Sequence, residues 1–214
     1  MIFAKILAAG LFLFLGENGI EVVYPAIEPA RPIEFVSLEA STEVVEGFWS
    51  TTELNSYNIP LDSLPERTLI RLEGGFSCPY GRNVFSHYGR RHGRNHAGVD
   101  IPVPPGTEVV SAFQGVVRLS TYHRGYGNII IIRHANGLET AYAHLSERKV
   151  KSGDIVSAGD LIGLSGSTGR STGPHLHFET LYCGHSFDPE SFIDVKNGTL
   201  LQRPFFMLRR ENLD

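Results

Sequence analysis

The stretch Gly173–Glu179 reads GPHLHFE, and the fold of the chain can be worked out from it. Two histidines that alternate with Leu176 and Phe178 are typical of a β-strand, because alternate side chains of a strand share a face. His175 and His177 therefore lie on one face, about 7 Å apart along the backbone, while the two apolar side chains face a core. Since neutral imidazole is a common metal ligand, this face is a candidate metal site.

A second cluster upstream, HAGVD at residues 96–100, adds a histidine and a carboxylate, and zinc accepts both ligand types. In an extended strand His96 and Asp100 would lie about 13 Å apart, too far for two bonds of about 2 Å to one ion. We therefore expect a helical turn or a bend between them, and Gly98 permits a bend. Three protein ligands with an open fourth position define a catalytic zinc site. His96, Asp100 and one of His175 or His177 would supply them.

From Phe76 onward, short apolar runs bounded by glycine predict an all-β domain, with nothing that resembles a long amphipathic helix. The Asn136-Gly137 pair is a strong signal for a hairpin turn. Gly125–Gly127 is predicted to form another turn, and two short strands with Gly-Asp turns are expected within 150–163. The main predicted strands are Val109–Leu119, Asn128–Arg133 and Leu138–Leu145.

Alternation along the predicted strand Leu138–Leu145 places Tyr142 and His144 on one face and Ala141, Ala143 and Leu145 on the other. A single histidine on a strand is most simply a polar-face residue. His144 is nevertheless a candidate functional residue, because a metal hydrolase needs groups beyond its ligands to take a proton from water and to stabilise developing charge.

Together these motifs resemble the lysostaphin-like zinc endopeptidases of the M23 family, which cut peptide cross-links in bacterial peptidoglycan. The resemblance runs from about Gly81 to Phe192, slightly over half of the chain, with the motifs in the family's order and spacing. The matching runs are SHYGRR at 86–91, HAGVD at 96–100, GYGN at 125–128, YAHL at 142–145 and STGRSTGPHLHFE at 167–179.

The resemblance implies a largely antiparallel β fold of the duplicated hybrid motif type, with a groove across the sheet. It makes His96, Asp100 and His177 the ligands of one zinc ion per chain, and His144 and His175 the catalytic pair, without saying which histidine is the base. The implied partner is a peptidoglycan peptide, cut at D-Ala to diaminopimelate or at a glycine bridge. The alternative is a non-catalytic wall-binding or amidase-activating module, but no matched family position is replaced.

The chain divides by composition. Residues 1–16 contain one cation, Lys5, and then an apolar run too short to span a bilayer, which predicts a secretory signal rather than a buried helix. Residues 17–66 contain ten acids against Arg31 alone, whereas residues 67–214 carry thirteen acids against seventeen Lys and Arg. We expect an acidic, extended arm over 17–70, the peptidase domain over 71–195 and a tail over 196–214.

Export predicts an oxidising compartment, in which Cys78 and Cys183 would either form a bridge or remain free thiols. The run Trp49–Pro65 resembles a lead segment of exported M23 proteins of the Bacteroidota, which implies a periplasmic or envelope location in a Gram-negative bacterium. We expect no membrane span once the signal is removed. Oligomeric state has no sequence signal.

Other chemistries fit poorly. The glycine-rich run 163–173 lacks the Gly-Lys-Ser/Thr ending of a phosphate loop and precedes a strand, which argues against nucleotide binding. Arg82, Arg90, Arg91 and Arg94 form a basic cluster, but an exported chain with net charge −4 is not expected to bind nucleic acid. A solvated face near an anionic wall polymer is the better interpretation of this cluster.

Overall fold

The computed structural model describes residues 12–16, 19–23, 49–57, 59–72, 74–79, 83–91, 93–134, 137–201 and 205–214. The chain divides into two compact units, Met1–Glu43 and Val44–Asp214. In the first unit, strands β1 (Phe12–Gly16) and β2 (Gly19–Val23) pair in an antiparallel manner. Most of the predicted signal peptide and the first part of the predicted arm lie outside the described residues.

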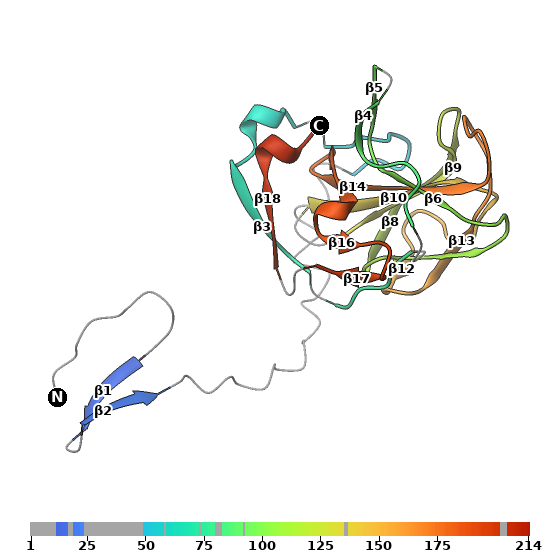
Figure 1. Ribbon diagram of the computed structural model, residues 1–214. Helices are drawn as coiled ribbons and strands as arrows, with labels where there is room; N and C mark the ends of the chain where they lie inside the picture. The colour runs from blue at the N-terminus through green and yellow to red at the C-terminus, as the bar shows by residue number, and fades with distance from the viewer. Residues whose placement is uncertain are drawn as a thin grey trace. The chain divides into compact units, whose positions relative to one another are not determined.

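The second unit is built from strands and short 3₁₀ helices, and the described part of the chain contains no α-helix (Figure 1). No described helix has the length and apolar character needed to cross a membrane. In chain order the elements are η1 Leu61–Ser63, β3 Arg67–Arg71, β4 Gly89–Arg91, β5 Arg94–His96, β6 Val99–Pro102, β7 Glu108–Val110, β8 Gly115–His123, β9 Gly127–Arg133, β10 Leu138–Leu145, β11 Glu147–Arg148, β12 Ile155–Val156, β13 Leu161–Leu164, β14 His175–Tyr182, β15 His185–Phe187, η3 Pro189–Ser191, β16 Ile193–Asp194, β17 Thr199–Leu200, β18 Phe205–Arg209 and η4 Arg210–Asn212.

The central sheet has the strand order β12-β8-β9-β10-β14-β15, with β6 also paired to β14, and every pair is antiparallel. The all-β expectation is therefore confirmed. One predicted strand, Val109–Leu119, is wrong as a single element. The chain leaves β7, which pairs with β13 in a small separate sheet, and enters the central sheet only at Gly115. A chain that passes from one sheet to another must interrupt its strand hydrogen bonds between the two. The apolar pattern of 109–119 does not show this interruption.

Each face of the central sheet packs against something different. Strand alternation places Ile130, Tyr142 and Phe178 in a large buried cluster on one face. On the opposite face lies a smaller apolar cluster that includes Ile131 and Ala143. The second face has little apolar side chain to bury, and it carries two buried polar clusters instead.

One of these clusters ties the segment Ser50–Tyr57 to the sheet. The fully buried Arg118 forms an ion pair with Glu139 at 2.6 Å, and its remaining donors reach the backbone oxygens of Ser50, Glu53 and Leu54. The guanidinium of Arg133 contacts the same carboxylate at 2.9 Å and lies over the ring of Tyr57. This part of the predicted arm is therefore packed on the domain.

At the other end of the chain, β18 pairs with β3 over five residues on each strand. The predicted tail thus forms a strand pair with the end of the predicted arm. Cys78 and Cys183 are not joined by a disulfide, and the thiol of Cys78 lies 3.9 Å from the backbone oxygen of Val195.

Candidate metal centre

Pairing between β14 and β6 assembles the centre of the site. His177 lies directly opposite Asp100, and Leu176 and Phe178 point into the core, as strand alternation predicts. The buried side chains of His175 and His177 share the opposite face of β14.

A bend brings His96 to the same point. Strand β5 ends at His96 and β6 begins at Val99, so the expected bend forms, rather than a helical turn. Gly98 allows it because a Cβ at this position would lie 2.3 Å from the backbone oxygen of Phe178. Any larger residue would push β6 away from β14 and separate Asp100 from His177.

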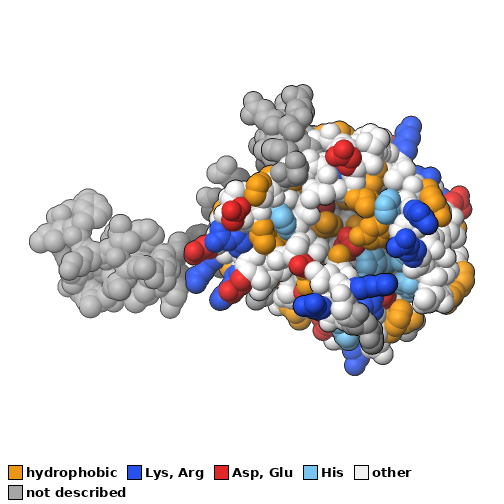
Figure 2. Space-filling view, turned by 90° about the horizontal axis from the view of Figure 1, so that it is seen from above, with side chains coloured by type: hydrophobic (Ala, Val, Ile, Leu, Met, Phe, Trp, Pro, Cys, Tyr) orange, Lys and Arg blue, Asp and Glu red, His pale blue; other side chains and the backbone are white. Residues whose placement is uncertain are grey.

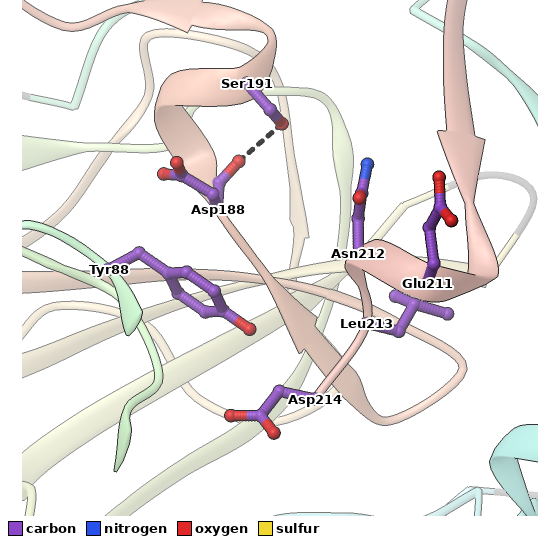
Figure 3. A pocket seen from close by; sticks show the side chains of 7 residues that line it. All are labelled: Tyr88, Asp188, Ser191, Glu211, Asn212, Leu213 and Asp214. Atoms are coloured by element: carbon purple, nitrogen blue, oxygen red, sulfur yellow. Dashed lines mark hydrogen bonds between the residues drawn. The ribbon is translucent and has the colours of Figure 1, made fainter. Parts of the chain in front are cut away.

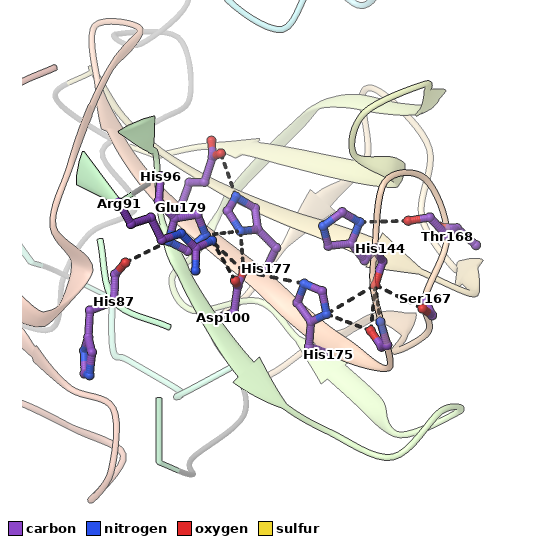
Figure 4. Close-up of polar contacts among 12 residues, drawn as sticks. His87, Arg91, His96, Asp100, His144, Ser167, Thr168, His175, His177 and Glu179 are labelled. Carbon is purple, nitrogen blue, oxygen red and sulfur yellow. Dashed lines mark hydrogen bonds and ion pairs between the residues drawn. The ribbon is translucent and has the colours of Figure 1, made fainter. Parts of the chain in front are cut away.

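Three donor atoms from these residues form a small triangle, shown in Figure 4. His96 Nε2 lies 3.1 Å from Asp100 Oδ1 and 3.2 Å from His177 Nδ1, and the latter two atoms are 2.8 Å apart. Donors around a tetrahedral zinc ion with bonds of about 2.0 Å are roughly 3.3 Å apart. The triangle is therefore close to one face of such a tetrahedron, with nitrogen and oxygen donors that zinc accepts.

A second set of contacts fixes the orientation of each donor. The Nδ1–H of His96 donates to the backbone oxygen of His87 at 2.8 Å, and the Nε2–H of His177 donates to Glu179 at 2.8 Å. Arg91 donates to the second oxygen of Asp100 at 3.2 Å. Such outer contacts are typical of metal-binding histidines and carboxylates, because they fix the tautomer and the direction of the free donor.

The sequence did not assign a role at the metal centre to Arg91, Glu179 or Tyr126, although it placed Arg91 in the basic cluster. Tyr126 donates its hydroxyl to Glu179 at 2.9 Å, and its ring lies 5.8 Å from that of His177. Glu179 could have been identified from the sequence, because it lies two residues after His177 and so shares its face of the strand. Tyr126 lies in a turn, and only the tertiary structure places it here.

The charges of the site favour a bound cation. Burial alone would lower the pKa of His177, but hydrogen bonds to Asp100 and Glu179 outweigh it and raise the pKa to about 9. Burial likewise opposes ionisation of Asp100, yet hydrogen bonds with His177 and His96 hold the pKa of Asp100 well below its usual range. The proton that raises the pKa of His177 is stabilised by the carboxylates of Asp100 and Glu179. A bound metal cation would be stabilised by the same negative charge.

His144 reaches the site through a backbone irregularity. The pairing of β10 with β9 shifts by one residue between Tyr142 and Leu145, which is a β-bulge, and His144 has a positive φ of 61°. Tyr142 and Leu145 both face the large core, whereas the ring of His144 lies 5.7 Å from that of His177. The prediction that His144 shares a face with Tyr142 is therefore wrong, because simple alternation ends at the bulge.

His144 and His175 are held in the same manner. The Nδ1–H of His144 donates to Thr168 and that of His175 to Gly173, both at 2.8 Å. Their rings lie 4.7 Å apart, and His175 Nε2 is 3.5 Å from Asp100 Oδ1. Burial lowers the pKa of His144 to about 4, so its ring is neutral near pH 7. With Nδ1 held, each ring exchanges a proton through Nε2, which in His175 faces Asp100.

A separate hollow of about 470 Å³, lined by Tyr88, Asp188 and residues of the chain end, contains none of these five residues (Figure 3). Two other histidines also lie elsewhere: His87 pairs with Glu190 through its side chain, and the buried His134 contacts Gln114 and Thr140.

Comparison with known proteins agrees with this geometry. Residues 94–189 match the model of the family described as peptidase family M23. The chain belongs to this family. It is 49% identical over 98 residues to the DD-carboxypeptidase/endopeptidase Mpg of Neisseria meningitidis, which covers 46% of this chain and 23% of that protein.

Two further relatives match the same M23 domain. The peptidoglycan DD-endopeptidase ShyC of Vibrio cholerae is 46% identical over 96 residues, or 45% of this chain and 22% of that protein. A crystal structure of a zinc containing peptidase from Vibrio cholerae aligns with a TM-score of 0.51 and 34% identity, covering 59% of this chain and 41% of that one. The chain thus spans under a quarter of the length of these curated relatives.

Proposed function

We propose that this M23 domain is a zinc endopeptidase that hydrolyses peptide cross-links of bacterial peptidoglycan. The observation that carries the proposal is the donor triangle of His96, Asp100 and His177, with the rings of His144 and His175 beside it. Three ligands on one side of an ion leave a coordination position open for water or substrate, as in catalytic zinc sites.

In this proposal His96 binds through Nε2, His177 through Nδ1 and Asp100 through Oδ1, and each chain holds one zinc ion. When bound there, zinc supplies Lewis acidity that favours loss of a proton from water and polarises a peptide carbonyl. Arg91 and Glu179 keep the ligands in place, because each holds the far side of a ligand side chain.

His144 and His175 are proposed to move the protons. Because Nδ1 of each ring is held by a backbone oxygen, each can accept a proton only at Nε2. One ring would take the proton of the attacking water at Nε2 and pass it to the leaving amine. The other ring, when protonated at Nε2, would donate a hydrogen bond to the developing oxyanion. The near-symmetric arrangement leaves both assignments of base and acid open to experiment.

The names and organisms of the relatives support a proposal for the substrate and the location. ShyC is named a peptidoglycan DD-endopeptidase and Mpg a DD-carboxypeptidase/endopeptidase, which supports a D-Ala cross-link over a glycine bridge. We propose that the chain acts in the periplasm or envelope of a Gram-negative bacterium, that residues 1–16 direct export, and that 71–195 form the peptidase domain between the arm and the tail.

The test is incubation of the purified protein with sacculi, followed by mass spectrometry of the released fragments. We expect cross-linked dimers to decrease and monomeric peptides with a new free D-Ala carboxylate to increase, in a reaction that a chelator stops and zinc restores. A protein that binds zinc and sacculi but releases nothing would instead be a non-catalytic wall-binding module.

A further inference from the structure

The short hairpin of β4 and β5 (Figure 1) ends at His96, a residue of the metal centre. Its register pairs Gly89 with His96, Arg90 with Asn95 and Arg91 with Arg94. The strand β5 thus carries a proposed zinc ligand at one end and an arginine two residues earlier. The hairpin is both the support of His96 and a carrier of positive charge.

The register determines which arginines face the site. Residues directly opposite each other in an antiparallel pair point to the same side, and so do residues two apart on one strand. Arg91, Arg94 and His96 therefore share one face of the hairpin. The side chain of Arg91 confirms the direction, since it reaches Asp100 Oδ2 at 3.2 Å.

Arg90 and Asn95 form the opposite face. The amide of Asn95 donates to Asp214 at 2.7 Å, so this face contacts the end of the chain. The hairpin thus separates two similar arginines, Arg90 and Arg94, onto different sides of the same short ladder.

The positive charge of Arg94 is not offset within the described part of the chain. Arg94 is exposed, and no described residue forms a hydrogen bond or an ion pair with it. Its cross-strand neighbour is Arg91, and like charges directly opposite each other destabilise a strand pair. Figure 2 shows Lys and Arg side chains at the margins of the hollow where the histidines gather. This arrangement favours an anion between the hairpin and the metal centre.

We propose that Arg94, with Arg91 beside it, binds a free carboxylate of the substrate peptide next to the scissile bond, and so selects acidic peptides. This inference rests on the proposed peptidase function. A guanidinium matches the planar geometry of a carboxylate and can bind it through two parallel hydrogen bonds. Arg94 lies about 7 Å along the strand from His96, which is one or two peptide residues from the reacting carbonyl.

The test compares Arg94→Gln with Arg90→Gln, a matched control on the other face of the same hairpin. The substrates are two synthetic cross-linked peptides that differ only in whether the free carboxyl groups near the scissile bond are carboxylates or amides. We expect Arg94→Gln to raise KM for the acidic peptide about 10-fold or more, the range of a charge-assisted hydrogen bond, with kcat nearly unchanged. Arg90→Gln should behave as the wild type, and the amidated peptide should not distinguish the variants.

Equal effects of the two substitutions, or an Arg94→Gln effect of the same size on the amidated peptide, would overturn the inference.

Calorimetric titration of the zinc-loaded protein with the acidic cleavage product gives a readout that does not depend on turnover. If the wild type cleaves neither peptide, the proposed function fails, while product affinity lost only in Arg94→Gln would still support the carboxylate site. Inorganic phosphate as a competitor shows whether the pair binds any anion; competition as strong as by the product would contradict selection for a peptide carboxylate.

Discussion

Two buried polar clusters lie on the same face of the central sheet, and they differ in what their side chains leave unsatisfied. Along β10 and β14 the paired rows are Ala143 with His177, Ala141 with Glu179 and Glu139 with Leu181. The histidine cluster thus lies at one end of this face and the Arg118–Glu139–Arg133 cluster at the other. Both are ionic and nearly excluded from solvent.

In the arginine cluster the guanidinium of Arg118 uses all five of its donors within the protein. Arg118 uses its donors on Glu139 and on three backbone oxygens, and it is fully buried. In the histidine cluster only the outer atoms of the rings are fixed, while the inner donors converge on one another. Burial and charge therefore do not identify a functional site. A functional site is indicated when several donor atoms converge on one point while the opposite atoms of the same side chains are held by hydrogen bonds. Donors arranged in this way are suited to bind a metal ion.

The largest expected effect comes from removing a proposed ligand. His177→Ala and His96→Ala each leave two protein ligands, so we expect zinc content to fall to background and cleavage to fall by more than about 10⁴-fold, beyond the loss of a proton-transfer group. Elemental analysis and a peptide cleavage assay measure both. His185→Ala, at a histidine outside the triangle that contacts the backbone oxygen of Ile59, is the control. Retention of zinc by His177→Ala but not by His175→Ala would show that the two roles are reversed.

Replacing the proton-transfer histidines separates chemistry from metal binding. His144→Ala and His175→Ala should keep near-stoichiometric zinc and lose about 10² to 10⁴ in rate, the usual range for a positioned acid or base. The same two assays apply. Zinc loss in His144→Ala would mean that this histidine is part of the coordination shell, and the distinction drawn from the triangle would be wrong.

Breaking the arginine cluster should affect stability and not the metal. Glu139→Gln keeps the shape of the side chain but leaves Arg118 and Arg133 without a counter-charge, which we expect to lower the free energy of unfolding by about 3 to 5 kcal/mol. Urea denaturation of the zinc-loaded protein measures this change. Glu147→Gln, at an exposed ion pair, should change it by less than about 1 kcal/mol. A folded Glu139→Gln protein with weakened zinc binding would contradict the separation of the two clusters.

The smallest expected effect lies in the outer contacts of the metal centre. Glu179→Gln keeps an oxygen near His177 but removes the charge, and we expect a 10- to 100-fold loss of zinc affinity. Tyr126→Phe, which removes only the hydroxyl that donates to Glu179, should lose less. Competition with a chromogenic chelator measures both constants, and Tyr122→Phe at an exposed tyrosine is the matched control. Unchanged affinity in Glu179→Gln would limit its role to packing.

The sequence predicted those parts of the site that follow strand alternation. The shared face of His175 and His177 and the bend at Gly98 both came from spacing and strand geometry. His144 was selected as a candidate but placed on the wrong face, because a bulge at a non-glycine residue leaves no signal in the alternation. The arginine cluster was missed for another reason: Arg118 and Glu139 are polar residues within apolar strands, and only pairing of β8, β9 and β10 with the segment Ser50–Tyr57 explains their burial.

The measurement that tests the account most directly is the zinc content of the wild-type protein, purified without chelator and then stripped and reloaded. If His96, Asp100 and His177 form the proposed centre, we expect close to one zinc ion per chain, restored by one equivalent of added zinc. A folded protein that carries no transition metal and fails to bind added zinc would contradict the central claim.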